Sequence, residues 1–78
     1  MSKVKLLELD DLCKYYTSKG QLRKGIKKAY HMQTNPFIVI EKEKDFIKNL
    51  KRWNINISKL LGVYIDKDLR WGYCIYYK

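Results

Sequence analysis

Apolar residues alternate with other residues on both sides of Asp66-Lys67-Asp68, and this pattern limits the possible folds more than any other in the chain. Alternation with a period of two is typical of strands that bury one face, and a short polar break between two such runs predicts a β-hairpin. A three-residue loop places the apolar side chains on one face, in the pairs Ile65 with Leu69, Val63 with Trp71 and Leu61 with Tyr73. A two-residue loop would mix the two faces, so we predict the three-residue loop.

Apolar residues at helical spacing predict three helices before this hairpin. The first lies near 9–17, where Asp10 or Asp11 would stabilise its start. The second runs from about 19 to 32, because Ser18 and Gln21 have the spacing of a capping box. The third covers about 43–53, with acidic residues at its start and basic residues at its end, the order that a helix dipole favours.

Asn35-Pro36 separates the second predicted helix from the third. The residue before a proline is disfavoured in the α conformation, so a helix stops there. The apolar run that follows predicts a short buried strand over about 37–41. We therefore expect one small α+β domain over 1–78, in the order α-α-β-α-β-β, with helices packed on a small antiparallel sheet that ends in the hairpin. Such an arrangement of helices and hairpin would be a variant of the winged helix.

Composition excludes several other classes of protein. A chain of 78 residues with 46% hydrophobic content has enough apolar area for one folded domain. Cys13 and Cys74 are far apart and form no metal-binding motif, so we expect two buried, reduced thiols and no metal or other cofactor. The sequence has neither a secretory signal over 1–11 nor an apolar run of transmembrane length. We expect a cytoplasmic monomer or small homo-oligomer without a membrane partner.

Positive charge is concentrated in one part of the chain. The formal net charge is +9, and six basic residues but no Asp or Glu lie between Lys14 and His31. Polyanions, above all nucleic acids, are attracted by such a local positive field. Within the second predicted helix, the basic residues fall opposite the apolar stripe. The sequence therefore indicates an amphipathic helix with one basic face.

The first two predicted helices, joined by a tight break at Thr17-Ser18-Lys19-Gly20, have the form of a helix-turn-helix. In this interpretation Arg23 reads a guanine edge, Gln21 reads an adenine edge, and lysines neutralise phosphates. The hairpin would act as a wing, and double-stranded DNA is a more fitting ligand than RNA. The predicted nucleic-acid-binding residues are Gln21, Arg23, Lys24, Lys27, Lys28, His31, Lys48, Lys51, Arg52, Tyr64, Lys67 and Arg70.

The sequence also bears on two other functional classes. A small inhibitor or adaptor of the kind that phages and mobile elements use, docking on an acidic host protein, fits the size and charge equally well. Enzymatic activity is not expected, because no motif places a nucleophile, a base and an orienting acid together. Gly20 and Gly25 have the glycine spacing of a P-loop, but Ile26 stands where the lysine would be. The expected function is therefore regulation or accessory binding of DNA.

Overall fold

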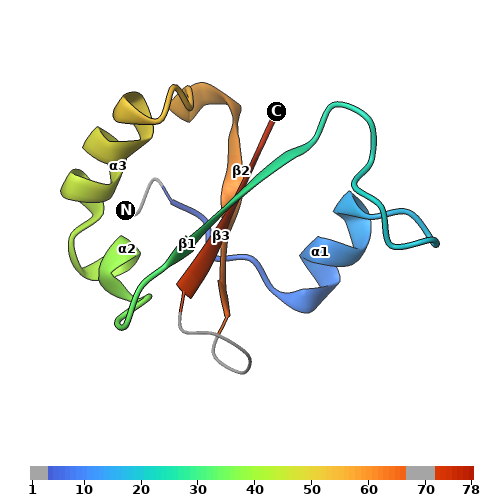
Figure 1. Cartoon of the computed structure of the whole chain (residues 1–78), viewed down its shortest axis with the longest axis horizontal. Coiled ribbons are helices and arrows are strands. Elements are labelled where there is room, and N and C mark those ends of the chain that lie inside the picture. Colours follow the sequence, from blue (N-terminus) through green and yellow to red (C-terminus); the bar gives the residue numbers. More distant parts are fainter. Residues whose placement is uncertain (1–3, 67–71) are drawn as a thin grey trace.

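The computed structural model describes residues 4–66 and 72–78 and has an α+β architecture (Figure 1). The helices and strands follow one another in the order α-β-α-α-β-β. The elements are α1 (Leu9–Tyr15), β1 (Lys27–Met32), α2 (Ile38–Glu41), α3 (Glu43–Arg52), the 3-10 helix η1 (Ile57–Lys59), β2 (Leu60–Asp66) and β3 (Gly72–Tyr77). The predicted fold class is confirmed, whereas the order of the second and third elements differs from the prediction.

The three strands form one antiparallel sheet in the order β1-β3-β2. In Figure 1, α2 and α3 lie to one side of the sheet and α1 lies to the other. Because side chains alternate between the faces of a strand, β3 contributes to a hydrophobic cluster on each side. Residues Gly72 to Tyr76 of this central strand are all buried. The domain thus has three layers, with the sheet in the middle.

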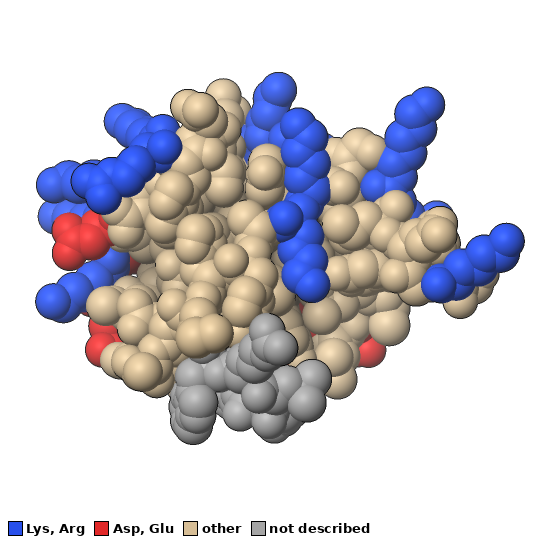
Figure 2. Space-filling model, in the orientation of Figure 1, with Lys and Arg blue, Asp and Glu red and all other residues tan. Residues whose placement is uncertain are grey.

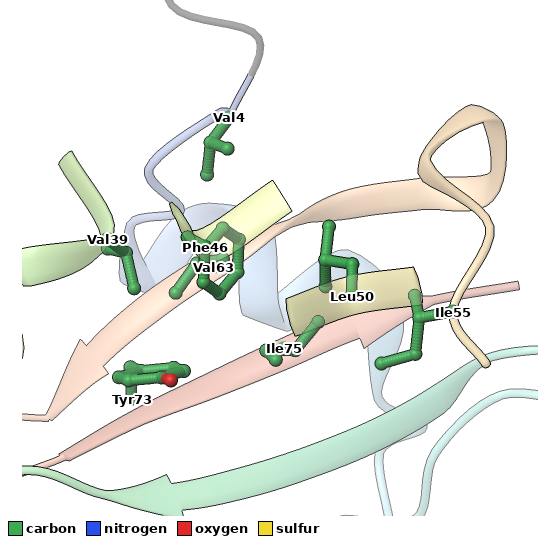
Figure 3. Close-up of a cluster of buried hydrophobic side chains, with 8 residues drawn as sticks. All are labelled: Val4, Val39, Phe46, Leu50, Ile55, Val63, Tyr73 and Ile75. Carbon is green, nitrogen blue, oxygen red and sulfur yellow. The ribbon is translucent and has the colours of Figure 1, made fainter. Parts of the chain in front are cut away.

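The larger cluster joins α2 and α3 to the sheet (Figure 3). Phe46 and Leu50 come from α3 at positions i and i+4, which lie on one face of a helix. They pack against Val63 of β2 and Ile75 of β3, both of which are fully buried. Val39, the one buried residue of α2, belongs to the same cluster. This apolar contact holds the helical layer on the sheet.

The second cluster covers the opposite face with α1 and the segments next to it. Tyr76 is its centre: its ring lies 5.8 Å from that of Tyr15 and meets that of Tyr16 edge to face at 6.1 Å. The hydroxyl groups of Tyr16 and Tyr76 are hydrogen-bonded at 2.8 Å, which satisfies a polar group that the fold buries. Burial, and then this hydrogen bond, raises the pKa of Tyr76 far above its usual value.

The N-terminal segment covers the outer edge of β2. The amide of Leu7 donates to Val63 O at 2.8 Å, and the amide of Val63 donates to Lys5 O at 2.9 Å. Gly62 is required at this crossing, because a β-carbon there would lie 2.6 Å from Leu7 Cδ2 and 2.8 Å from Lys5 O. This edge of the sheet is therefore partly paired by the chain itself.

The first and third predicted helices, near 9–17 and over about 43–53, are confirmed as α1 and α3. In the first turn of α1, Asp11 accepts a hydrogen bond from the amide of Glu8 at 2.9 Å, which lowers the pKa of the Asp11 carboxyl. Helix α3 ends in a Schellman motif, in which the amide of Ile55 donates to Leu50 O and that of Asn54 donates to Lys51 O. Asn54 has a φ of 60°, a conformation that asparagine tolerates better than most residues.

The helix predicted over 19–32 is wrong: residues 17–26 form a loop, and Lys27–Met32 form β1. The tight turn at its start is confirmed, since Gly20 N donates to Thr17 O at 2.9 Å. However, Gly20 and Gly25 have φ values of 79° and 89°, which a right-handed helix does not allow. A right-handed helix therefore cannot run through either glycine, and residues 4–66 and 72–78 form no helix-turn-helix or winged-helix arrangement.

The strand predicted over 37–41 is also wrong, because this segment forms the short helix α2. The side chain of Asn35 accepts a hydrogen bond from the amide of Phe37 at 3.2 Å, and the amide of Ile38 donates to Asn35 O. Proline is well tolerated in a first helical turn because the amide that it lacks would have no partner there. Pro36 therefore precedes a new helix, and the apolar run after it buries Val39 through helical geometry.

The hairpin is confirmed, but its predicted register is wrong. Val63 pairs with Ile75 and Ile65 pairs with Tyr73, so these two residues lie opposite partners four positions later than predicted. An even shift preserves the faces of these residues. Leu61 nevertheless lies in the α1-side cluster, because an irregularity between Leu60 and Gly62 interrupts the alternation. The predicted turn residues Lys67 and Asp68 lie outside the described residues.

The second face of the hairpin is covered as well. Cys74 and Tyr76 on that face are buried beneath α1 and its flanking segments. Cys74 was correctly predicted as a buried thiol, and burial raises its pKa. Cys13, in contrast, is exposed on α1. Within the ranges 4–66 and 72–78, no helix is long and apolar enough to cross a membrane.

Truncating Leu50 tests the contact between α3 and the sheet. Leu50 is fully buried, so we expect Leu50→Ala to lower the free energy of unfolding by about 2 to 5 kcal/mol. Leu9→Ala is the matched control, because Leu9 is 66% exposed and its truncation should cost less than about 0.5 kcal/mol. Urea unfolding followed by circular dichroism measures both; equal losses would contradict this packing.

Candidate nucleic-acid interface

The sheet topology gathers basic residues that are far apart in the sequence. Tyr77 at the end of β3 pairs with Lys27 on one side and with Leu60 on the other. The amide of Lys78 donates to Lys59 O at 3.0 Å. Because neighbouring strands lie about 5 Å apart, Lys27, Lys59 and Lys78 share one end of the sheet.

This end continues into the last turn of α3 and the loop before β1. We call it the basic rim: Lys24, Lys27, Lys28, Lys51, Arg52, Lys59 and Lys78. All seven residues are exposed, and none forms an ion pair with a residue in the described part of the chain. Figure 2 shows basic side chains along the top of the molecule and also at its left and right, while the visible acidic side chains lie at the left, next to basic ones, and at the lower right. The rim therefore presents charge of a single sign.

Lys27 and Lys28 project from opposite faces of the sheet, because successive residues of a strand do so. Lys27 shares its face with Ala29, which packs toward α3, and Lys28 lies opposite Tyr76, whose ring is on the α1 side. The basic rim thus surrounds the end of the sheet instead of occupying one flat face. An extended polyanion could follow this end from α3 to the loop before β1.

Two predicted base-reading residues lie in the loop instead of on a helix. Gln21 is exposed, and its backbone closes the turn with Thr17, since Thr17 N donates to Gln21 O at 2.7 Å. Arg23 Nε donates to Lys14 O at 3.1 Å, so this guanidinium helps to hold the loop against the end of α1. The recognition helix that was predicted to carry both side chains is a loop here, so their predicted contacts with bases lose the helix on which they were placed.

The predicted residues of α3 are exposed as expected. Lys51 and Arg52 lie in its last turn and belong to the basic rim, and Lys48 lies one turn earlier. Basic residues at this position also stabilise the helix through its dipole, which gives them a structural role as well.

His31 was predicted on the basic face and instead packs into the α3-side cluster. Its ring stacks on Trp53, with the centroids 4.0 Å apart and the planes at 19°, and also on Tyr73 at 5.7 Å. Burial lowers the pKa of the imidazole below 6.5. As a strand residue, His31 shares a face with Ala29, whereas helical spacing would have grouped it with the lysines. His31 is therefore half-buried against the aromatic side chains of the α3-side cluster and is not counted in the basic rim.

None of the residues predicted for the wing is fully exposed in the part of the chain that the structure describes. Tyr64 is half-buried and packs against the α1-side cluster. Lys67 and Arg70 lie outside the described residues. The structure therefore brings together Lys24, Lys27, Lys28, Lys51 and Arg52 from the predicted set and adds Lys59 and Lys78.

Lys59 and Lys78 were missed because their proximity depends on the hairpin register. In the predicted register, residue 61 lies opposite residue 73, which would place Lys78 beyond the start of the first hairpin strand. The actual pairing of Leu60 with Tyr77 brings the two lysines together. Both residues lie in segments without Asp or Glu, and that absence was the available sequence signal.

A pocket opens beside the basic rim, between the end of α3 and η1. Its volume is about 330 Å³, and it is lined by Ile47, Leu50, Lys51, Asn54, Ile55, Asn56 and Ile57. No group of three or more His, Cys, Asp or Glu side chains could hold a metal ion within residues 4–66 and 72–78. The chemistry available at this site is therefore charge attraction, amide hydrogen bonding and apolar contact.

The packing of His31 predicts a dependence of stability on pH. Because the folded state lowers the pKa of His31, the unfolded chain takes up a proton first as the pH falls below about 6.5. We expect the urea midpoint of unfolding to decrease between pH 7.5 and 5.5. His31→Gln has no imidazole and should show a smaller decrease over this interval, whatever its stability at pH 7.5. An equal decrease in both proteins would contradict the assignment.

Comparisons with known proteins give no family for this chain. No protein-family model, no curated protein and no solved structure matches it. The basic rim and the pocket beside it are therefore interpreted from their own chemistry.

Proposed function

We propose that this protein binds nucleic acid through the basic rim by neutralising phosphates. One observation carries this proposal: Lys27, Lys59 and Lys78 share one end of the sheet, four further cations lie in the segments that adjoin it, and none of the seven is paired with a described acidic residue. A protein gains solubility from scattered charge of either sign, but convergence of a single sign creates a strong local field. Phosphate chains carry regularly spaced negative charges that match an extended surface of this kind.

The composition of the basic rim favours binding with little sequence preference. Six of its seven residues are lysines, whose ammonium groups act as point charges toward phosphate. Reading of a base edge usually requires an arginine or an amide side chain held in a groove. Arg23 and Gln21 were expected to do this from a recognition helix, which does not form. The proposal therefore replaces major-groove reading with contact to the phosphate backbone.

A salt titration tests the proposal. If the rim neutralises about five phosphates, the slope of log K against log salt concentration should be about −4, and affinity should fall about 250-fold between 50 and 200 mM salt. We expect Lys27→Gln/Lys59→Gln to reduce the magnitude of this slope by about 1.5, because each lost contact retains its counterion. Fluorescence anisotropy with labelled single-stranded and duplex DNA measures the slope.

Lys42→Gln/Lys44→Gln is the matched control, since it removes the same charge from the start of α3. These lysines are exposed beside Glu41, Glu43 and Asp45 in the sequence and lie outside the basic rim. Their replacement should leave the slope nearly unchanged. Equal effects of the two double variants would indicate attraction by net charge alone, and binding without salt dependence would exclude phosphate neutralisation. Retention of an acidic protein after nuclease treatment, without DNA binding, would instead favour the inhibitor or adaptor function.

A further inference from the structure

The pocket between α3 and η1 has an apolar floor and a polar border. Leu50 and Ile55 form part of the floor and are almost completely buried, whereas Ile57 is 37% exposed. Asn54 and Asn56 contribute amide groups to the lining. Pockets that bind small groups usually combine apolar walls with a few such polar groups. This arrangement suits a ligand with apolar faces and a hydrogen-bonding edge.

The two amides retain hydrogen-bonding capacity. Asn56 Oδ1 accepts bonds from the amide and the hydroxyl of Ser58, at 3.0 and 2.9 Å, so its carbonyl is used and its NH₂ group has no described acceptor. Asn54 is exposed, and its side chain makes no hydrogen bond to a residue in the described ranges. Asn56 can therefore donate to a ligand, and Asn54 can both donate and accept.

Backbone hydrogen bonds hold both sides of the pocket. The Schellman bonds at the end of α3 include Ile55 N to Leu50 O at 2.8 Å, and the cap of η1 includes Lys59 N to Asn56 O at 2.9 Å. These bonds fix the segment that connects α3 with β2. Because the pocket is formed without a ligand, binding would require little ordering of the chain.

Positive charge adjoins the pocket on both sides. Lys51 lines the pocket directly. Lys59 lies two residues after Ile57, and its backbone carbonyl accepts a hydrogen bond from the amide of Lys78. No Asp or Glu occurs between residues 46 and 65. A ligand group that enters the pocket would thus lie beside cations, which disfavours cationic ligands and favours a segment of a polyanion.

We propose that the pocket takes one unpaired base of a single-stranded nucleic acid, with the flanking phosphates on Lys51 and Lys59. This inference rests on the proposed function and adds a preference for single strands. A base offers apolar faces to the isoleucines and donors or acceptors on its edge to the two amides. In a duplex, the base faces are stacked and the edge is paired, so entry would first require the base to unstack and unpair. A single strand presents its bases with a smaller cost.

An abasic oligonucleotide separates the base from the phosphates. We expect a ten-nucleotide thymidine strand to bind about tenfold more tightly than an abasic strand of the same length, measured by competition anisotropy at one fixed salt concentration. Ile57→Ala, which shortens the exposed wall, and Asn54→Gly, which removes an amide but permits the positive φ, should each reduce this ratio toward one. Both variants should keep the salt slope of the natural chain.

Ile40→Ala is the matched control, because Ile40 is 42% exposed on α2 and does not line the pocket. It should leave the tenfold ratio unchanged. Equal, salt-dependent binding of the thymidine and abasic strands would overturn the base pocket and leave phosphate binding by the basic rim standing. Failure of both strands to bind at low salt would overturn both proposals. Circular dichroism of each variant verifies that it is folded.

Discussion

Burial of β3 on both faces is the interaction on which the other features depend. Ile75 contributes to the cluster beneath α3, and the next residue, Tyr76, contributes to the cluster beneath α1. The same strand lies between the other two in the order β1-β3-β2, so its backbone is paired at both edges. The same arrangement brings the start of β1 and the start of β2 to the end of β3. The basic rim is thus a consequence of how a small chain covers its central strand.

Gathering cations at this end has a cost in stability. Seven like charges repel one another, and no described acidic residue is paired with them. Part of the cost is relieved because the side chains are exposed and screened by salt, and because Lys51 and Arg52 interact favourably with the dipole of α3. The remaining lysines gain no such compensation from the fold. A surface that opposes folding but attracts phosphate is better explained by binding than by stability.

The parts of the fold that could be predicted are those with local causes. Helices α1 and α3 follow from apolar spacing and charged ends, and the alternation around residue 66 correctly indicates a hairpin. A helix was wrongly predicted over 19–32 because the apolar residues of this segment fit a helical stripe, although Gly20 and Gly25 favour turns. Pro36 was correctly recognised as a break, but its suitability for a first helical turn was overlooked. The register of the hairpin was predicted wrongly because the local pattern of apolar side chains does not determine how the two strands pair along their whole length.

The candidate site shows the same division between local and distant causes. Lys27 and Lys28 were correctly predicted as exposed, yet they lie on an edge strand, and the change from helix to strand moves His31 from the lysines to Trp53. Lys59 and Lys78 could not be associated with them before the partners of Tyr77 were known. The pocket likewise depends on Asn54, whose positive φ turns the chain back after α3. Charge alone therefore indicates a class of partner, whereas the preference for an unpaired base arises from a pocket that only the folded chain creates.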